Sequence, residues 1–280
     1  MPVEAYHRPT SLDDALDLAA EHESALEVIS GGTLTMPAVN EGHAFPSHVL
    51  DLRELGLDYV NTSDGAVTLG ATATLTQVIE EADVSVLETA AQHTGSWAVR
   101  NLATVGGNLF APPPLGDFAV ALLALDADVQ IEGPTGERTI PLADFYADSN
   151  ALAADELVTE IQLPAVEGET AYTKYTRKQE PAPPIVTVVA HVERADDGTV
   201  NAARLALNGA GPHPMRMTDA EDALAGSSLD DETIEAAADA AADAADPPED
   251  AVASTWYRRK MVREYVSRTL SEIATAEDTQ

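Results

Sequence analysis

The sequence predicts an α+β fold, and three observations support that prediction. Near the N-terminus, short apolar runs alternate with segments of helical periodicity, which is typical of a small parallel sheet with helices. In the last third, apolar runs separated by turn signals predict a three-stranded antiparallel sheet that is followed by helices. Between these regions, residues 164–171 (P-A-V-E-G-E-T-A) have the composition of a linker.

The elements expected before this linker follow from caps, periodicity and turn residues. A short strand lies within residues 1–8, and a helix begins at Thr10 or Ser11, because Ser11 and Asp14 form a variant capping box. Residues 36–45 form a loop or a short helix. The other expected strands are 26–29, 49–52, 67–69, the hairpin 129–131 with 138–140, and 157–163. The other expected helices are 75–82, 84–94 and 118–125.

The elements expected after the linker form a simpler series. The turn at Asp196-Asp197-Gly198 reverses the chain between two apolar runs, which predicts an antiparallel meander. The expected strands are 172–177, 185–192 and 200–207. The expected helices are 218–225, 230–245 and 254–275, of which the middle one is rich in alanine.

The charge of the chain is its strongest compositional signal. Lys and Arg total 15 whereas Asp and Glu total 48, so the formal net charge is −33. Self-repulsion at this density destabilises a compact state in dilute salt, and molar salt relieves it by shortening the Debye length to about 3 Å. We therefore expect a halophilic protein of haloarchaeal type, and the alternative is an ordinary acidic surface. The same charge argues against nucleic acid as a partner, since binding it requires a basic surface.

Missing residue types exclude several kinds of site. The chain has no cysteine, so it holds no disulfide, thiolate zinc site or iron–sulfur cluster. None of its seven histidines stands at metal-ligand spacing from another ligand, so no metal site is expected. No apolar run is long enough to span a bilayer and no signal-peptide pattern is present, so the expected location is the cytoplasm.

Two glycine pairs are the strongest local motifs. Gly31-Gly32 lies in the first glycine segment, residues 30–34, and Gly106-Gly107 lies in the second, residues 104–108. Each pair is expected to follow a strand-like run. Glycine permits positive φ and lets backbone N–H groups approach an anion. A turn is the alternative for either pair alone, and neither matches G-x-G-x-x-G or the phosphate loop. The residues thus predict an anion or dinucleotide site without naming its ligand.

With these motifs, the chain resembles the flavin-binding medium subunits of the molybdenum hydroxylases, the family of xanthine dehydrogenase and aerobic carbon monoxide dehydrogenase. The first segment is similar to the family's A-G-G-[TH]-[DS]-L, and residues 100–109 are similar to its R-N-x-[AG]-T-[IV]-G-G-N-L. Asp117 matches an aspartate nine residues after the asparagine of that motif. Further matches are Asp51-Leu52, the run 121–127 and Tyr257-Arg258-Arg259.

The resemblance implies a domain organisation. Residues 1–166 would form an FAD-binding domain of the vanillyl-alcohol-oxidase-like type, with subdomains of about 1–57 and 58–166. Residues 167–280 would form the C-terminal domain of a flavoprotein subunit, a three-stranded antiparallel sheet with a helical bundle.

The resemblance also implies the cofactor site. Main-chain N–H groups of both glycine segments would bind the pyrophosphate and ribityl part of FAD. Asp117 would lie near the sugar hydroxyls and Lys174 near the ring, where a cation stabilises reduced flavin. The alternatives are a helix N-cap for Asp117 and a strand-edge lysine for Lys174. No catalytic residue is expected. The expected cofactor-binding residues are Ile29, Ser30, Gly31, Gly32, Thr33, Leu34, Thr104, Val105, Gly106, Gly107, Asn108, Asp117, Leu157 and Lys174.

The function implied by the resemblance is electron transfer. FAD would accept electrons from a [2Fe–2S] small subunit and pass them to an external acceptor, while a molybdenum-cofactor large subunit oxidises and selects the substrate. Two alternatives are a solo FAD-dependent oxidoreductase and a flavin-free assembly or scaffold subunit. One departure stands out: where relatives often carry an aromatic that can lie on the flavin, residues 180–184 read E-P-A-P-P. Ring stacking from this segment is therefore not expected.

Overall fold

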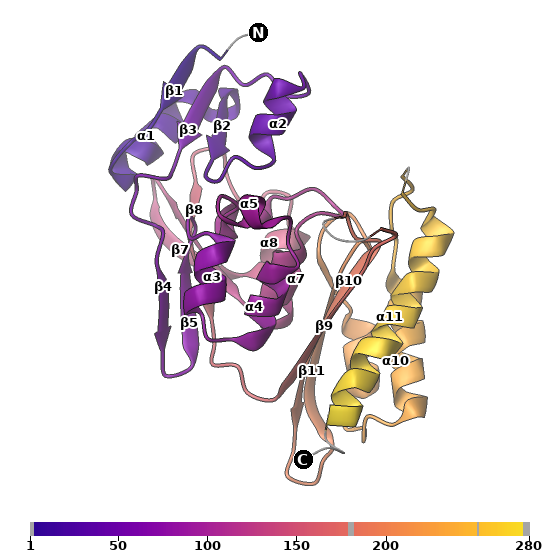
Figure 1. Ribbon diagram of the computed structural model, residues 1–280. Helices are drawn as coiled ribbons and strands as arrows, with labels where there is room; N and C mark the ends of the chain where they lie inside the picture. Colours follow the sequence, from indigo (N-terminus) through magenta and orange to yellow (C-terminus); the bar gives the residue numbers. More distant parts are fainter. Residues whose placement is uncertain (1–2, 179–181, 251, 277–280) are drawn as a thin grey trace. The chain divides into compact units, whose positions relative to one another are not determined.

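The computed structural model describes residues 3–178, 182–250 and 252–276, in two compact units that are each built from three segments of the chain (Figure 1). Unit 1 comprises Met1–Asp83, Ser96–Ala111 and Ala127–Pro164, and unit 2 comprises Val84–Gly95, Pro112–Asp126 and Ala165–Gln280. The expected domains, residues 1–166 and 167–280, are continuous in sequence whereas these units are not, and they remain predictions. Positions 180 and 181 of the Pro-rich departure lie outside the described residues.

Unit 1 begins with a three-stranded parallel sheet. Its strands are β1 (Ala5–His7), β2 (Leu26–Ile29) and β3 (His48–Asp51), in the order β1-β3-β2. Helix α1 (Leu12–His22) and the short helix η1 (Glu23–Ala25) connect β1 to β2. The side chain of Ser11 accepts a hydrogen bond from the Asp14 N–H at 3.2 Å, which fixes the start of α1. The expected parallel sheet and the cap at Ser11 are confirmed.

A five-stranded antiparallel sheet completes unit 1. The strand order is β4-β5-β8-β6-β7, and β4 had no counterpart among the expected strands. The strands are β4 (Val60–Ser63), β5 (Ala66–Gly70), β6 (Asp128–Gly133), β7 (Gly136–Pro141) and β8 (Leu157–Leu163). The helices of this unit after α1 are α2 (Thr35–Asn40), α3 (Leu75–Glu81), α5 (Trp97–Arg100), α6 (Val105–Leu109) and α8 (Leu142–Ala147).

Unit 2 is organised around an antiparallel sheet. The expected meander is confirmed as β9 (Glu169–Tyr175), β10 (Val186–Arg194) and β11 (Val200–Asn208), and the two-residue strand β12 (Met215–Arg216) adds a fourth strand next to β11. The helices of unit 2 are α4 (Ser85–Gln92), α7 (Asp117–Ala124), α9 (Thr218–Leu224), α10 (Asp231–Ala244) and α11 (Thr255–Ala276).

Helices cover both faces of this sheet, which makes unit 2 a three-layer structure (Figure 1). On β10, Val186 and Val188 belong to the apolar cluster shared with α10 and α11. Thr187 lies between them and points to the opposite face, where its hydroxyl donates to Asp117 at the start of α7. All eight residues of α7 are buried, so no face of this helix is exposed to solvent.

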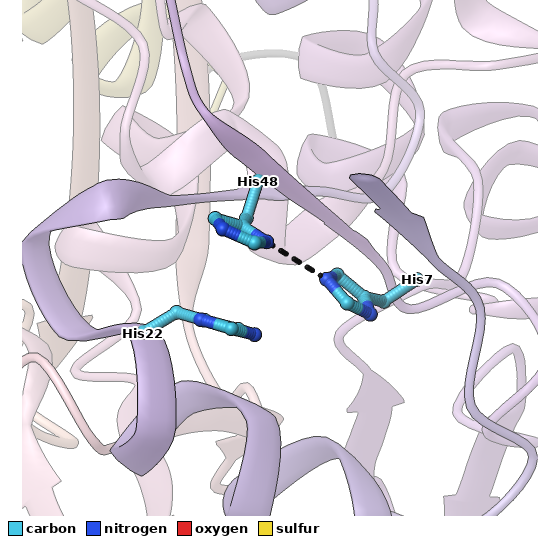
Figure 2. Close-up of side chains that lie close together, drawn as sticks. All are labelled: His7, His22 and His48. Atoms are coloured by element: carbon cyan, nitrogen blue, oxygen red, sulfur yellow. Dashed lines mark hydrogen bonds between the residues drawn. The ribbon is translucent and has the colours of Figure 1, made fainter. Parts of the chain in front are cut away.

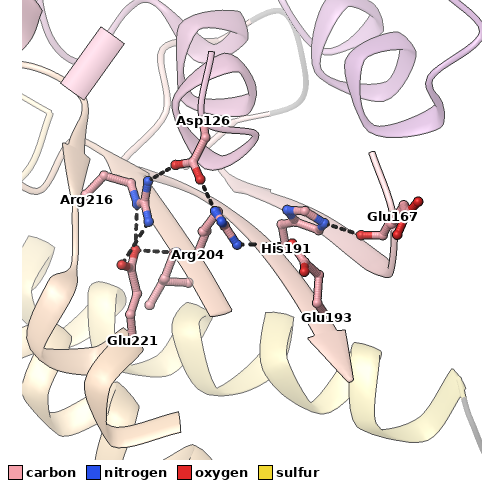
Figure 3. A network of polar contacts seen from close by, with 8 residues as sticks. Asp126, Glu167, His191, Glu193, Arg204, Arg216 and Glu221 are labelled. Atoms are coloured by element: carbon pink, nitrogen blue, oxygen red, sulfur yellow. Dashed lines mark hydrogen bonds and ion pairs between the residues drawn. The ribbon is translucent and has the colours of Figure 1, made fainter. Parts of the chain in front are cut away.

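A polar network joins the end of α7 to the edge of the same sheet (Figure 3). Asp126 follows α7 and forms ion pairs with Arg204 on β11 and, at 2.5 Å, with Arg216 on β12. Arg216 also pairs with Glu221 on α9 at 2.6 Å, and Arg204 pairs with Glu193 on β10 at 3.2 Å. A single ion pair at the surface contributes little to the stability of a protein. Here, however, the one carboxylate of Asp126 pairs with two guanidinium groups and so links α7, β11 and β12.

Candidate functional site

The two glycine segments come together inside unit 1. The first follows β2 and leads into α2, and its Gly32 has a φ of 65°, in the left-handed region that favours glycine. A Cβ atom on Gly31 would lie 1.8 Å from the carbonyl oxygen of Leu102 and 3.1 Å from Cα of Ala103. Only glycine therefore lets this backbone approach the residues that precede the second segment.

The first segment presents unsatisfied donors. Within the described part of the chain, no hydrogen bond leaves the N–H groups of Gly31, Gly32 or Thr33, and the buried hydroxyl of Ser30 has no partner. A buried polar group without a hydrogen-bond partner lowers the stability of the fold. Such groups are therefore expected where a bound ligand supplies the missing hydrogen bond. Successive N–H groups without partners, next to a glycine of positive φ, are typical of a backbone site that binds an anion.

The second segment is a short helix, so the expected strand before it is wrong. Residues 97–100 form α5, which Ser96 caps, and residues 105–109 form α6, which Thr104 caps by accepting from the Gly107 N–H at 3.2 Å. The two glycines fit a helix here because Gly106 packs against Ala71, whose carbonyl oxygen would lie 2.8 Å from a Cβ atom. Close packing thus offsets the low helix propensity of glycine.

Hydrogen bonds within the protein occupy the N–H groups of residues 105–108 in the second segment. Val105 donates to the carbonyl of Ala73, and Gly106 donates to the carbonyl of Ala71, both at 2.9 Å. Gly107 and Asn108 donate to the hydroxyl and carbonyl oxygens of Thr104. The two segments therefore differ: the N–H groups of residues 31–33 have no hydrogen-bond partner among the described residues, whereas those of residues 105–108 bond within the protein.

Asp117 and Lys174 form an ion pair inside unit 2. Their carboxylate and ammonium groups lie 2.8 Å apart, and the side chains are 6% and 4% exposed. Asp117 also accepts from Thr187 at 2.6 Å, and Lys174 donates to the carbonyl of His93 at 2.6 Å. Gly116 is the N-cap of α7, so the alternative that Asp117 caps the helix is wrong. Lys174 is on the edge strand β9, but its side chain is not an exposed one.

Two other expected cofactor residues have apolar side chains in the core. Ile29 ends β2 and is buried, and Leu157 begins β8 and packs against Ala15, Leu50 and Leu52. Leu157 thereby packs the five-stranded sheet against the parallel sheet of unit 1. The contacts of both residues with a cofactor, like those of the other expected site residues, stay predictions.

One cluster of side chains that could hold a metal ion was not expected from the sequence. His7, His22 and His48 lie together in unit 1, although they are far apart in sequence (Figure 2). Burial lowers the pKa of His7, and the neighbouring rings of His22 and His48 lower it further. Spacing along the sequence, on which no metal site was expected, does not show this proximity of the three rings in space. Only the pairing of β1 with β3 could have indicated the cluster.

Comparisons with known proteins agree with one another over almost the whole chain. Residues 2–166 match the family model described as the FAD binding domain in molybdopterin dehydrogenase, and residues 170–273 match that of the CO dehydrogenase flavoprotein C-terminal domain. Within the described residues, no helix is both long and apolar enough to cross a membrane.

Relatives and solved structures of similar length support these matches. The nicotine 6-hydroxylase medium subunit of Paenarthrobacter nicotinovorans is 30% identical over 97% of this chain and 98% of its own. The glyceraldehyde dehydrogenase medium chain of Sulfolobus acidocaldarius is 28% identical over 98% and 99%. A solved structure of carbon monoxide dehydrogenase from Hydrogenophaga pseudoflava contains a chain that is 29% identical, with a TM-score of 0.90 and 98% coverage of both chains.

Proposed function

Because the chain belongs to the FAD-binding medium subunits of the molybdenum hydroxylases, we propose that it binds FAD and carries electrons from an iron–sulfur subunit to an external acceptor. It is the flavoprotein subunit of an oxidoreductase. The observation that carries the FAD assignment is the first glycine segment, where Gly31 packs on the Leu102 carbonyl and neighbouring N–H groups are free.

The residues of this segment fit the diphosphate of the cofactor. The N–H groups of Gly31, Gly32 and Thr33 would donate to its oxygens, and the hydroxyl of Ser30 would gain the partner that it lacks. Main-chain donors suit a chain with a net charge of −33, in which basic side chains are few. FAD, when bound, supplies the ring that accepts and releases electrons. The protein positions that ring and sets its surroundings.

Selection of the substrate belongs to other subunits of the complex. Relatives that match almost the full length of this chain are named for complexes that act on nicotine and on glyceraldehyde. One subunit type therefore serves complexes with unlike substrates. We expect the partners of this chain to be a large molybdenum-cofactor subunit and a small [2Fe–2S] subunit, and we expect the complex to work in the cytoplasm with an external electron acceptor.

The first test is the visible absorption spectrum of the chain purified in molar salt, with the released cofactor identified. FAD at about one per chain supports the assignment. If the folded chain carries no flavin and takes up none from added FAD, the assignment fails and the scaffold alternative replaces it.

A second measurement separates a subunit from a solo enzyme. Substrate-dependent reduction of the flavin is expected only when the molybdenum and iron–sulfur subunits are present. Reduction of the flavin by a substrate with the isolated chain would instead establish a solo oxidoreductase.

A further inference from the structure

The three histidines of Figure 2 come from separate elements that meet on one face of the parallel sheet. His7 is the last residue of β1, His48 is the first residue of β3, and His22 is the last residue of α1. Because Ala5 pairs with His48 and His7 pairs with Leu50, the two strand histidines point to the same face.

Helix α1 covers this face and brings the third histidine to it. Leu50 and Ala15 belong to one apolar cluster, which fixes α1 against β3. The C-terminal end of α1 then lies over the start of β3, where the rings of His22 and His48 stack with centroids 3.8 Å apart. The cluster is thus held by the core of unit 1.

The ring nitrogens are arranged closely enough to share an ion. Nε2 of His7 and Nδ1 of His48 are 3.1 Å apart, and one nitrogen from each of the three rings lies within 4.8 Å of the others. In a tetrahedral zinc site with Zn–N distances near 2.05 Å, two ligand nitrogens are about 3.3 Å apart. The spacing of the His7 and His48 nitrogens, which share a hydrogen bond in the absence of an ion, is close to this value. Because a metal lies in the plane of each imidazole that binds it, the His22 ring, which stacks on His48, has to turn for its nitrogen to face the ion.

The electrostatic surroundings favour a cation. The chain carries a net charge of −33, the carboxylate of Glu21 acts on His7, and the C-terminal end of a helix has partial negative charge. Imidazole nitrogens prefer zinc, nickel and copper to magnesium or calcium. Among the described residues, the cluster holds three ligands and no carboxylate, which leaves a fourth position for water.

We propose that His7, His22 and His48 bind one divalent transition-metal ion of the zinc class, which joins β1, α1 and β3. With three separate elements as ligands, the ion stabilises the N-terminal sheet of unit 1. This site is separate from the glycine segments, so metal binding does not depend on the FAD assignment.

The test uses the full-length chain as purified, without an affinity tag, after a chelator has removed bound metal, in molar NaCl at pH 7.5. Zn²⁺ and Co²⁺ are added, bound metal is counted after equilibrium dialysis, and the visible spectrum of bound Co²⁺ is recorded. We expect one tightly bound ion per chain and the intense Co²⁺ absorption of a tetrahedral site. Metal at 100 times its dissociation constant should raise Tm by roughly 5 °C.

Matched variants test which histidines bind the ion. His22→Ala is expected to weaken Zn²⁺ binding at least tenfold, whereas His43→Ala removes an exposed histidine of the same unit and leaves binding unchanged. His48→Gln provides a second loss variant if His22→Ala does not fold, and circular dichroism reports whether each variant folds.

Three outcomes would overturn the proposal. They are failure of the native chain to bind Zn²⁺, equal binding by the His22→Ala or His48→Gln variant and the native chain, and equal affinity for Mg²⁺, which would place the ion on carboxylates.

Discussion

Asp117 and Lys174, which are 57 positions apart in sequence, form an ion pair of 2.8 Å that is almost completely buried in unit 2. The pair joins the start of α7 to β9, and Thr187 adds a third contact from β10. Removing one member of such a pair leaves an uncompensated buried charge, which costs more than the pair itself contributes.

Replacement of Lys174 by methionine should therefore destabilise the protein by about 3–5 kcal/mol. Urea unfolding in molar salt measures this, and Lys260→Met is the control, because it removes an exposed lysine. The double variant Lys174→Met/Asp117→Asn should recover part of the loss. A single variant as stable as Lys260→Met would show that the pair is not buried as described.

The contact of Gly31 with Leu102 should make both folding and FAD binding intolerant of any side chain. In Gly31→Ala, a methyl group 1.8 Å from a carbonyl oxygen forces the two glycine segments apart. We expect FAD content to fall far below one per chain and Tm to fall. Gly56→Ala is the control, since Gly56 has a positive φ but open space around it, and it should lose only about 1–2 kcal/mol and keep its FAD. Equal FAD content in both variants would contradict the site.

Asp51 should make the stability of unit 1 depend on pH. Burial alone would raise the pKa of this carboxyl, but hydrogen bonds from Arg53 and Tyr6 outweigh burial and lower the pKa. A lowered folded-state pKa gives stability that is present above the unfolded-state pKa of about 4 and is lost as pH falls through the folded-state value.

The variant Asp51→Asn should accordingly be less stable than the native chain at pH 7, and the difference should shrink below about pH 4. Urea midpoints between pH 3 and pH 7 measure it. Asp17→Asn removes an exposed carboxylate of α1 and should follow the native curve. A difference that is constant with pH would contradict a lowered pKa at Asp51.

The net charge of −33 should make folding depend on salt. We expect Tm to rise steeply as NaCl increases from about 0.1 M to molar concentration, where the Debye length falls from about 10 Å to about 3 Å. Thermal unfolding over this range is the measurement. A Tm that is flat or falls with salt would contradict the prediction that the protein is halophilic.

Local chemistry predicted most elements of the fold. Ser11 and Asp14 place the start of α1, and the turn at Asp196-Asp197-Gly198 places the hairpin of β10 and β11. Prediction from local sequence failed where packing outweighs helix propensity. Gly106 and Gly107 have low helix propensity, yet they lie in α6. Glycine is required at position 106 because Ala71 leaves no room for a side chain there.

The candidate site was predicted in its parts but not in its arrangement. The glycine pairs stand out in the sequence, whereas the approach of Gly31 to Leu102 depends on packing between elements more than 70 residues apart. The cluster of His7, His22 and His48 was missed for the same reason, since spacing along the chain does not show which parallel strands pair.

The interleaving of the two units bears on how the protein is made. The chain runs through six alternating segments, so it crosses between the units five times and neither unit is continuous. Helix α7, buried on every side, leaves the ribosome several seconds before β10 and β11, at about 5–20 residues per second. The apolar surface of α7 is therefore exposed until β10 and β11 have been synthesised. We therefore expect the nascent chain to need shielding until residue 208 has emerged, and the two units to be inherited together and not exchanged as separate modules.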